Sequence, residues 1–371
     1  MKLKYLPILL LLFLFAIDKI FIIPSVRKAI VQNHVNSYEV LNNLLDKLYK
    51  EHIEKYKKIS NLSADEVEKE TIIFMGTSRS VEFANMKDSL FDKNPFVKNA
   101  AATSRIPVTS WTIRAAPFIH IYQIYNHFIN THTRPKLVVV EVSYPSFNKN
   151  NIFKKKSDIH DFTFDEFLDS HGEFSNADKI EYLSSVFFVL NRSNINWKGL
   201  LSSGINTNTD VNATLDFVLD AKKLMEMREN QGSWMQGTKE NQEDEALVNT
   251  YQKYTDWVLQ SFYQNVQIDL TSFNLLKKIV REAKQKNVNL VLYRARTHSS
   301  LKKATARYAK KEEIWLQEVT KLAKENSVSF YDYETSGALE CDYFVDTSHM
   351  SKSCFPEMLE KIVEGEKKKS N

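Results

Sequence analysis

The sequence predicts a three-layer α/β/α domain with a central parallel sheet, preceded by an N-terminal transmembrane helix and a helical stalk. Three observations support this fold class. Short apolar runs typical of buried strands alternate with helix-like stretches, which indicates a parallel sheet covered on both faces. The stretch before them repeats apolar residues at helical spacing. Residues 5–23 are an apolar segment of nearly the ~20 residues that cross a bilayer.

Composition places the chain among globular proteins and excludes several classes. Of its 371 residues, 43% are hydrophobic and 12% aromatic, enough to bury a sizeable core. Only 8 glycines and 8 prolines are present, which excludes collagen-like and low-complexity chains. The net charge of +4 is spread along the sequence, so we expect no nucleic-acid partner.

The N-terminal segment predicts a signal anchor over residues 1–28. A basic start with Lys2 and Lys4 precedes the apolar run, and the adjacent Asp18 and Lys19 can pair or reach toward an interface. No small-residue cleavage site follows, which favours an uncleaved anchor over a cleaved signal peptide, the alternative. Residues 29–70 then read as a helical stalk.

The body, residues 71–371, follows an alternating strand and helix pattern. Residues 71–75, 136–142, 288–293 and 328–331 are the expected strands. Helices are expected after Gly76 as far as Met86 and over residues 117–130, 275–284, 304–326 and from Phe355 onward. Residues 150–265 interrupt the alternation of strands and helices, and we interpret them as a helical insertion that forms a lid or a cap over the substrate.

Two segments far apart in the chain carry the residues expected to do chemistry. Ser78 follows the first strand, and the carboxyl ends of parallel strands are where open sheets bind ligands. A serine there begins a helix, whose N–H groups favour a developing oxyanion. Asp346 and His349 lie three residues apart near the C-terminus, so Asp346 can orient His349 as the base for Ser78.

Other interpretations of these residues remain open. Ser78 could simply cap the helix, and Ser80 is a rival nucleophile. Arg79 is a candidate for binding an anionic group of the substrate, or is a solvated helix residue. The basic side chains of residues 293–298, which follow the third expected strand, could contact a phosphate or a sugar, or are ordinary polar loop residues. We expect three further histidines to be core or surface residues: His120, His127 and His132.

The two cysteines, Cys341 and Cys354, flank the segment with Asp346 and His349. In an exported domain they would form a disulfide that braces this loop, whereas in a reducing compartment they would be buried thiols. They do not form a CxxC or Cys/His cluster, so no metal or organic cofactor is expected.

A strand ending in Gly76-Thr77-Ser78, together with Asp346-Thr347-Ser348-His349 before the last helix, resembles the SGNH/GDSL hydrolase superfamily. Within it the chain is similar to membrane-anchored bacterial members: a leptospira-type family of SGNH-like proteins, DltD-like proteins and the alginate O-acetylation proteins. The resemblance implies that Ser78, His349 and Asp346 are nucleophile, base and orienting acid.

The middle motifs depart from the superfamily pattern. Asn99 is followed by Ser104 where a glycine is common, and we expect Asn99 in the site and a backbone N–H of Ser104 in the oxyanion hole. Pro145 replaces the usual Asn of the third motif and supplies no donor. The residues that could take its place are Ser143, Tyr144, Ser146 and Asn148.

The resemblance implies a membrane-anchored serine esterase or O-acyltransferase. It would act on a cell-envelope glycan or lipid acyl acceptor, with a multispanning membrane acyltransferase as a partner. The expected location is the bacterial inner membrane, with the catalytic domain in the periplasm. The alternative is a non-catalytic envelope binding or scaffold protein with a decayed SGNH fold, which the departures at Ser104 and Pro145 favour.

Overall fold

The computed structural model describes residues 12–13, 15–16, 18–19, 37–60, 62–86, 90–91, 94–113, 116–132, 135–151, 162–187, 238–243, 245–335 and 337–370. These residues divide into two compact units, one drawn from residues 1–44 and 156–225 and the other from residues 45–155 and 226–371. The larger unit contains the sheet and the candidate site.

A five-stranded parallel sheet forms the centre of the larger unit. Its strands are β1 (Ile72–Gly76), β2 (Val108–Thr112), β3 (Leu137–Glu141), β5 (Leu290–Arg294) and β6 (Ser329–Asp332). They lie in the order β2-β1-β3-β5-β6, and every pairing is parallel. The predicted α/β class and central parallel sheet are confirmed, and β2 is an additional strand that the sequence did not predict.

The strand order places a topological switch between β1 and β3. The chain moves from β1 to β2 on one side and then returns to β3 on the other, so the connections leave in opposite directions. Met75 of β1 lies opposite Trp111 of β2 and Val140 of β3. Ligands in open α/β sheets bind beyond the carboxyl ends of the strands at such a point. Ser78 follows β1, so it lies at this point.

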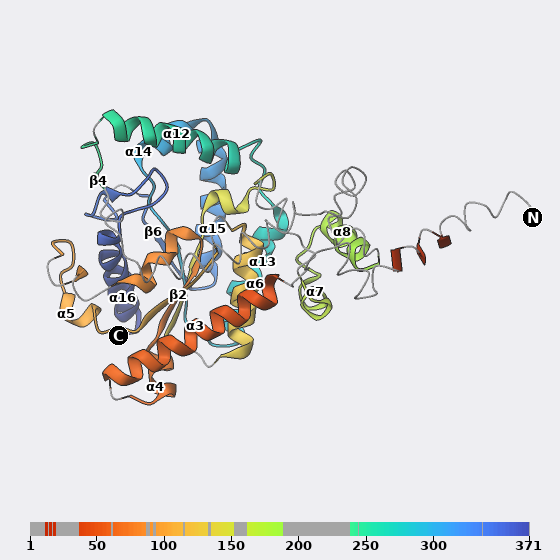
Figure 1. The fold of residues 1–371 in the computed structure, drawn as a ribbon, viewed down its shortest axis with the longest axis horizontal. Coiled ribbons are helices and arrows are strands. Elements are labelled where there is room, and N and C mark those ends of the chain that lie inside the picture. Colours follow the sequence, from red (N-terminus) through yellow and green to blue (C-terminus); the bar gives the residue numbers. More distant parts are fainter. Residues whose placement is uncertain are drawn as a thin grey trace, which may run out of the picture. The chain divides into compact units, whose positions relative to one another are not determined.

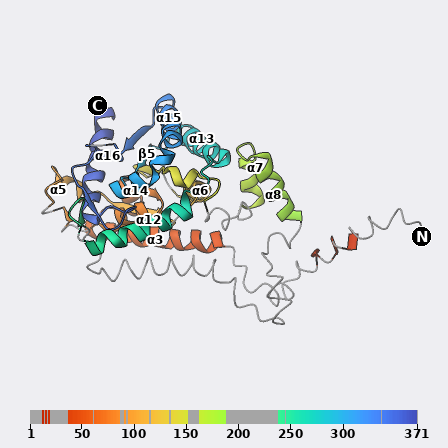
Figure 2. The same ribbon diagram turned by 90° about the horizontal axis from the view of Figure 1, so that it is seen from above.

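Helices cover both faces of the sheet (Figures 1 and 2). One face packs on α16 (Phe355–Ser370), whose residues Met358 and Ile362 join Phe74 and Val139 in one buried cluster. On the other side lie three helices: α6 (Phe118–Thr131), α13 (Leu270–Gln285) and α15 (Ala309–Glu325). The strands are buried on both faces, which explains why they read as continuous apolar runs.

Short elements complete the connections. They are α4 (Ala64–Glu70), η2 (Ser78–Asn85), α5 (Ala100–Thr103), η4 (Tyr144–Phe147), α14 (Ser299–Thr305), η7 (Ala306–Tyr308) and η8 (Lys352–Cys354). The helix expected after Gly76 is the 3₁₀ helix η2. The helix expected over 304–326 is divided among α14, η7 and α15.

Helix α3 (Ser37–Ser60) and α4 make up the described part of the predicted stalk. From Leu45 onward α3 packs on the sheet unit, where the buried ring of Tyr49 meets Trp111 and Phe128 at centroid distances of 6.0 and 5.4 Å. Residues 29–36 lie outside the described residues. The described stalk is therefore helical, and its part from Leu45 onward belongs to the sheet unit.

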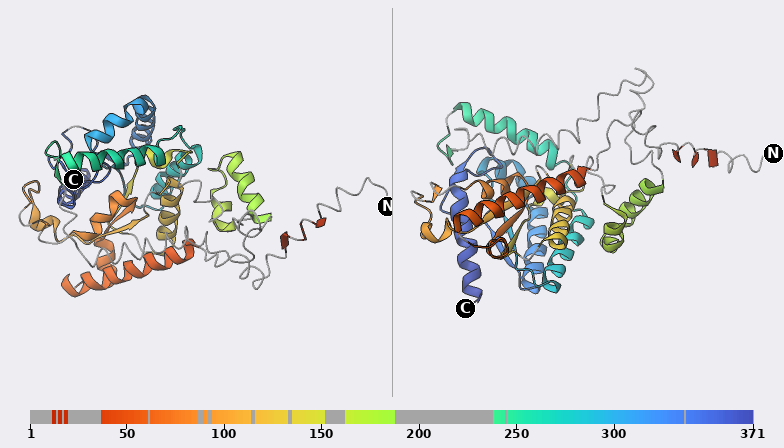
Figure 3. Two further views of the ribbon diagram at one scale, coloured as in Figure 1. Left: turned by 45° about the horizontal axis from the view of Figure 1, so that its top comes forward. Right: turned by 60° about the horizontal axis from the view of Figure 1, so that its bottom comes forward.

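The predicted insertion contributes to both units. In the smaller unit, α7 (Phe164–Ser170) and α8 (Asn176–Phe187) pack through Phe167 and Tyr182, whose rings stack at 3.9 Å. In the larger unit, β4 (Thr238–Lys239) and α12 (Glu245–Phe262) lie beside the C-terminal loop. Figure 3 shows α12 and α3 on different sides of the sheet unit. Residues 188–237 lie outside the described residues.

Most of the predicted anchor also lies outside the described residues. Within the part that is described, Asp18 and Lys19 form an ion pair of 3.2 Å. No helix among the described residues is long and apolar enough to cross a membrane.

Candidate active site

The turn after β1 presents Ser78 at the first position of η2. Thr77 caps this helix with extended backbone, and its hydroxyl accepts a hydrogen bond from the Arg79 N–H at 3.4 Å. Gly76 has no room for a side chain, because a Cβ there would lie 2.5 Å from the Cβ of Glu141. Ser78 itself is partly exposed. The sequence therefore folds into a tight strand-to-helix turn with the serine at its accessible corner.

A buried carboxylate at the end of β3 holds this turn in place. Glu141 is fully buried and accepts hydrogen bonds from the Thr77 N–H at 2.8 Å and the Thr77 hydroxyl at 2.7 Å. It also accepts the Ser80 hydroxyl at 2.6 Å. A buried carboxylate is tolerated only when its oxygens are hydrogen-bonded in this way. Ser80, the rival nucleophile, is thus buried and already engaged.

Ser78, His349 and Asp346 meet in a hydrogen-bonded chain. The Ser78 Oγ lies 2.7 Å from the His349 Nε2, although the two residues are 271 positions apart. On the far side of the ring, His349 Nδ1 lies 2.9 and 2.8 Å from the two carboxylate oxygens of Asp346. A base within 2.6–3.2 Å of a hydroxyl, oriented by a third group, is the geometry of an activated serine nucleophile.

The environment of Asp346 keeps it ionised. Burial alone would raise its pKa, but His349 and the backbone N–H groups of Ser348 and His349 hold the pKa below its usual range. Those two N–H groups donate at 2.7 and 3.0 Å. A carboxylate fixed by its own loop orients the imidazole and stabilises the imidazolium that forms during proton transfer.

The loop that carries Asp346 and His349 is braced from two directions. Cys341 and Cys354 form a disulfide across it, with Cα atoms 5.3 Å apart. The short strand β7 (Tyr343–Phe344), just before Asp346, pairs antiparallel with β4 of the insertion. Of the two alternatives that the sequence left open for these cysteines, the disulfide is the one present, and the insertion contributes a strand beside the loop.

Helix α12 packs on the same loop. The Tyr251 hydroxyl donates to the Phe344 carbonyl at 3.2 Å, and the Thr255 hydroxyl donates to that of Thr347 at 3.2 Å. Tyr254 lies between them on this helix face, with its ring centroid 6.5 Å from that of His349. Burial and the charge of Asp346 raise the pKa of Tyr254 to about 12, so its hydroxyl stays protonated and is hydrogen-bonded to Ser348.

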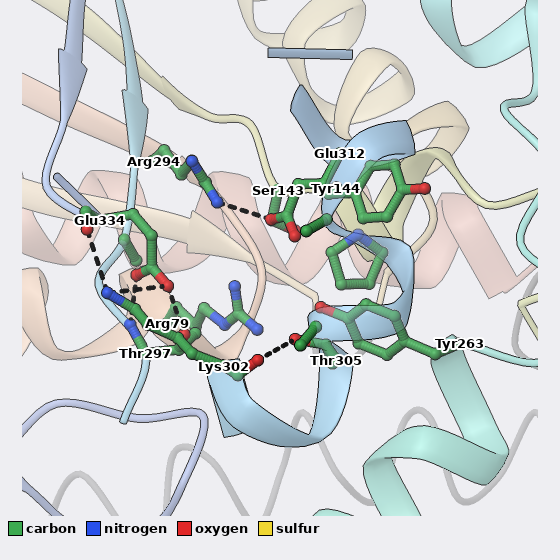
Figure 4. A pocket seen from close by; sticks show the side chains of 14 residues that line it. Arg79, Ser143, Tyr144, Tyr263, Arg294, Thr297, Lys302, Thr305, Glu312 and Glu334 are labelled. Atoms are coloured by element: carbon green, nitrogen blue, oxygen red, sulfur yellow. Dashed lines mark hydrogen bonds and ion pairs between the residues drawn. The ribbon is translucent and has the colours of Figure 1, made fainter. Parts of the chain in front are cut away.

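A pocket of about 220 Å3 opens beside the turn that carries Ser78. Arg79 and Ser143 line it, together with residues from the ends of β5, α14 and α15 (Figure 4). Ser143 follows β3 and Arg79 follows Ser78, so the pocket occupies the switch point of the sheet. The sequence predicted that Arg79 and Ser143 contact the substrate, and both residues lie on the wall of this pocket.

Ser104 is not positioned as the sequence predicted. Its backbone N–H donates to the Ala100 carbonyl at 2.9 Å within the turn of α5, so it has no free donor for an oxyanion. The backbone N–H of Asn99 is likewise engaged, by the Glu360 carboxylate of α16. The short helix α5 satisfies its own backbone and docks on α16, which is why this motif does not supply a donor.

Asn148 also has a structural role in place of the expected substrate contact. Its amide donates to the Phe262 carbonyl at 2.8 Å, and its oxygen accepts the Gln267 N–H at 3.0 Å. The side chain joins η4 to the loop after α12. Ser143 shares a hydrogen bond of 2.9 Å with Ser146, and Tyr144 lines the pocket.

The remaining polar residues considered from sequence mostly form ion pairs or lie in the core. Arg296 pairs with Glu240 at 2.6 Å, which ties the segment after β5 to the insertion. His127 and His132 both contact Asp46 of α3. Burial lowers the pKa of His120 to about 3, so it is neutral. Among the described residues, no cluster of His, Cys, Asp or Glu could hold a metal ion.

Sequence reasoning missed two residues that shape the site. Glu141 had a visible signal, since it is a single acid within the apolar run of residues 136–142. A charge in a strand buried on both faces needs dedicated partners. Tyr254 carried no such signal, because its position beside His349 depends on how the insertion folds back.

Comparison of the sequence with known proteins places the chain in one family. It belongs to the family described as "Protein of unknown function (DUF1574)", whose model matches residues 1–365. No curated protein matches the chain. No solved structure matches it either.

Proposed function

We propose that this member of the DUF1574 family is a serine acyl-ester hydrolase or O-acyltransferase with an SGNH-like fold. The observation that carries the proposal is the 2.7 Å contact between Ser78 Oγ and His349 Nε2. Nothing local joins residues 271 positions apart, and a capping serine would have no reason to meet a histidine that is itself held by a carboxylate.

In the proposed reaction, Ser78 Oγ attacks the carbonyl carbon of an acyl ester while His349 Nε2 takes the hydroxyl proton. The tetrahedral intermediate collapses, the bond from carbon to the leaving oxygen breaks, and His349 returns the proton to the departing alcohol. Water or an acceptor hydroxyl then attacks the acyl carbon while His349 takes its proton. The bond between the acyl carbon and Ser78 Oγ breaks, and His349 returns the proton to Oγ. Asp346 stays ionised throughout and stabilises the imidazolium.

The oxyanion would be held at the N-terminus of η2. The Ser78 N–H is among the first N–H groups of η2, and the first N–H groups of a helix have no partner within the helix. Ser143, on the wall of the adjacent pocket, is the second donor we propose in place of Ser104. Donors aimed at the developing negative charge typically contribute 10²–10³ in rate each.

We further propose that the domain faces the periplasm, held in the inner membrane by residues 5–23. The disulfide supports this location, because such bonds persist in oxidising compartments. The proposed acceptor is a cell-envelope glycan or lipid, and the proposed partner is a multispanning acyltransferase. Membrane fractionation tests the anchor: we expect the chain in the membrane fraction, and a soluble mature protein starting after residue 25 would contradict it.

Labelling with a fluorophosphonate probe tests the nucleophile. The full-length protein should be labelled, and peptide mapping should find the adduct on Ser78 and not on Ser80. Ser78→Ala should abolish labelling without changing the melting temperature, whereas Ser184→Ala, outside the proposed triad, should label normally.

If the folded wild-type protein is not labelled, the non-catalytic binding or scaffold function takes the place of the enzyme. The loss of Ser104 as a donor is the observation that favours this second candidate.

A further inference from the structure

Three basic side chains line the pocket beside Ser78, and two of them are neutralised. Arg294 pairs with Glu312 at 2.6 Å and Asp332 at 3.4 Å. Lys302 pairs with Glu334 at 3.4 Å. Arg79 forms neither an ion pair nor a side-chain hydrogen bond with any residue that the structure describes.

Arg79 extends into the pocket between Glu334 and Tyr263 (Figure 4). No dashed line joins its guanidinium to any side chain drawn there. It is only partly exposed. A partly buried arginine with five donors and no acceptor is costly unless an anion or water satisfies it.

Two buried tyrosines lie on the same wall of the pocket. Tyr144 and Tyr263 are 1% and 5% exposed, and both line the pocket. The Tyr144 hydroxyl has no hydrogen-bond partner among the described residues. Burial, then Glu312 and Tyr308, raises the pKa of Tyr144 to about 12. Burial also raises the pKa of Tyr263. Both hydroxyls therefore remain protonated and able to donate near neutral pH.

We propose that this pocket binds the anionic group, a carboxylate or a phosphate, of the ester that Ser78 attacks. This inference rests on the proposed function and specifies its substrate class. Arg79 supplies the positive charge and a bidentate hydrogen-bond donor. Arg294 and Lys302 are already paired with neighbouring carboxylates. Because Arg79 directly follows Ser78, a bound anion would place the ester close to the nucleophile.

The pocket volume limits the size of the group. A cavity of ~150 Å3 accepts benzene. At about 220 Å3, this pocket admits a carboxylate or phosphate with a few attached carbons. A longer glycan or lipid would extend out of it.

Direct binding to the full-length Ser78→Ala protein tests the pocket independently of catalysis. Calorimetry should detect succinate and inorganic phosphate but not the neutral succinamide. Arg79→Gln should weaken binding by ~10–100-fold, the range for a hydrogen-bonded charge. Arg105→Gln, an exposed arginine, should leave it unchanged. Equal binding by Arg79→Gln and its parent, or no binding by either, would overturn the inference.

Ester kinetics identifies which side of the ester carries the anion. The substrates are a neutral acetyl ester, a hemisuccinyl ester of the same alcohol, and an acetyl ester of glycerol phosphate. Wild-type kcat/KM should favour one of the anionic esters, and Arg79→Gln should remove that preference while still cleaving the neutral ester.

The two proposals fail in different ways. Cleavage of the neutral ester without any preference for the anionic esters would refute the anion site but not the proposed enzyme function. If the protein shows neither labelling nor ester cleavage but binds anions through Arg79, the proposed enzyme function is refuted and the anion site is not.

Discussion

Glu141 and Thr77 are joined by two hydrogen bonds across neighbouring strands, one to the backbone N–H and one to the hydroxyl. The carboxylate that receives both is fully buried at the end of β3. Thr77 immediately precedes Ser78, so β3 fixes the position of Ser78, the proposed nucleophile, through this contact. The turn that carries Ser78 therefore depends on a buried side chain of the neighbouring strand.

Glu141→Gln should destabilise the protein and slow probe labelling of Ser78. The amide retains one acceptor but turns an NH2 toward the donors of Thr77 and Ser80. Hydrogen bonds to a charged group contribute ~1.5–3 kcal/mol, so we expect a loss of that order. Urea unfolding and labelling rates measure the two effects. Glu318→Gln, an exposed acid, should change neither, and a Glu141→Gln protein with wild-type stability would contradict the bracing role.

Gly76→Ala should be poorly tolerated. The added Cβ would lie 2.5 Å from the Glu141 Cβ, so the turn or β3 must shift. Overpacking of this kind typically costs ~1–3 kcal/mol, and the shift would also move Ser78 away from His349. Gly172→Ala is the matched control, since nothing lies within 4 Å of a Cβ there. Thermal unfolding should separate the two variants, and equal melting temperatures would refute the steric argument.

Removing the disulfide should loosen the loop that carries the base. Cys341→Ala with Cys354→Ala releases a cross-link of sequence separation 13, for which the chain-entropy estimate is ~3 kcal/mol. We expect a lower melting temperature and slower labelling of Ser78. Reductant should have the same effect on the wild-type protein and none on the double variant. A reduced protein that labels at the wild-type rate would show that β7 and α12 suffice to hold the loop.

Tyr254→Phe should slow probe labelling of Ser78 and have only a small effect on the free energy of unfolding. The change removes the hydroxyl bonded to Ser348 but keeps the ring beside His349. A neutral hydrogen bond contributes ~0.5–1.5 kcal/mol, which corresponds to a ~2–10-fold loss in rate if it acts on the position of His349. Tyr333→Phe removes another buried hydroxyl, bonded to Met358, and should affect stability alone.

Acid should destabilise the fold through its buried histidines. Burial lowers the pKa of His120 to about 3 and that of His52 to about 4, while an unfolded histidine titrates near ~6.5. The folded-state pKa values are depressed, so stability is complete above ~6.5 and falls as pH drops toward the folded values. Each histidine should reduce the free energy of unfolding by about 1 kcal/mol from pH 6 to pH 5. His120→Phe should remove the part of this pH dependence that is due to His120. His171→Phe, at an exposed histidine, should leave the pH dependence unchanged.

Much of the framework followed from local patterns in the sequence. The four predicted strands appear as β1, β3, β5 and β6 because strands buried on both faces need unbroken apolar runs. Strand β2 was missed because its sequence, Val-Thr-Ser-Trp-Thr, mixes polar and apolar residues at the edge of the sheet. The proposed triad combined two local motifs with the rule that parallel strands end at one edge.

The rest of the site depended on long-range folding. The motif at Asn99 and Ser104 was assigned by analogy, but α5 satisfies its own backbone against α16. Tyr254 reaches His349 only because α12 returns over the C-terminal loop. Pairing between Arg294 and Glu312 neutralises one basic residue and leaves Arg79 unpaired among the described residues, and no sequence pattern reveals that difference.

The distance along the chain between Ser78 and His349 has a consequence for biosynthesis. Ribosomes add ~5–20 residues per second, so 271 residues separate the appearance of the serine from that of the histidine by roughly 15–50 s. During that interval the nascent chain carries a serine without a base, which is a weak nucleophile. If the proposed function holds, ester chemistry at Ser78 begins only when synthesis is nearly complete.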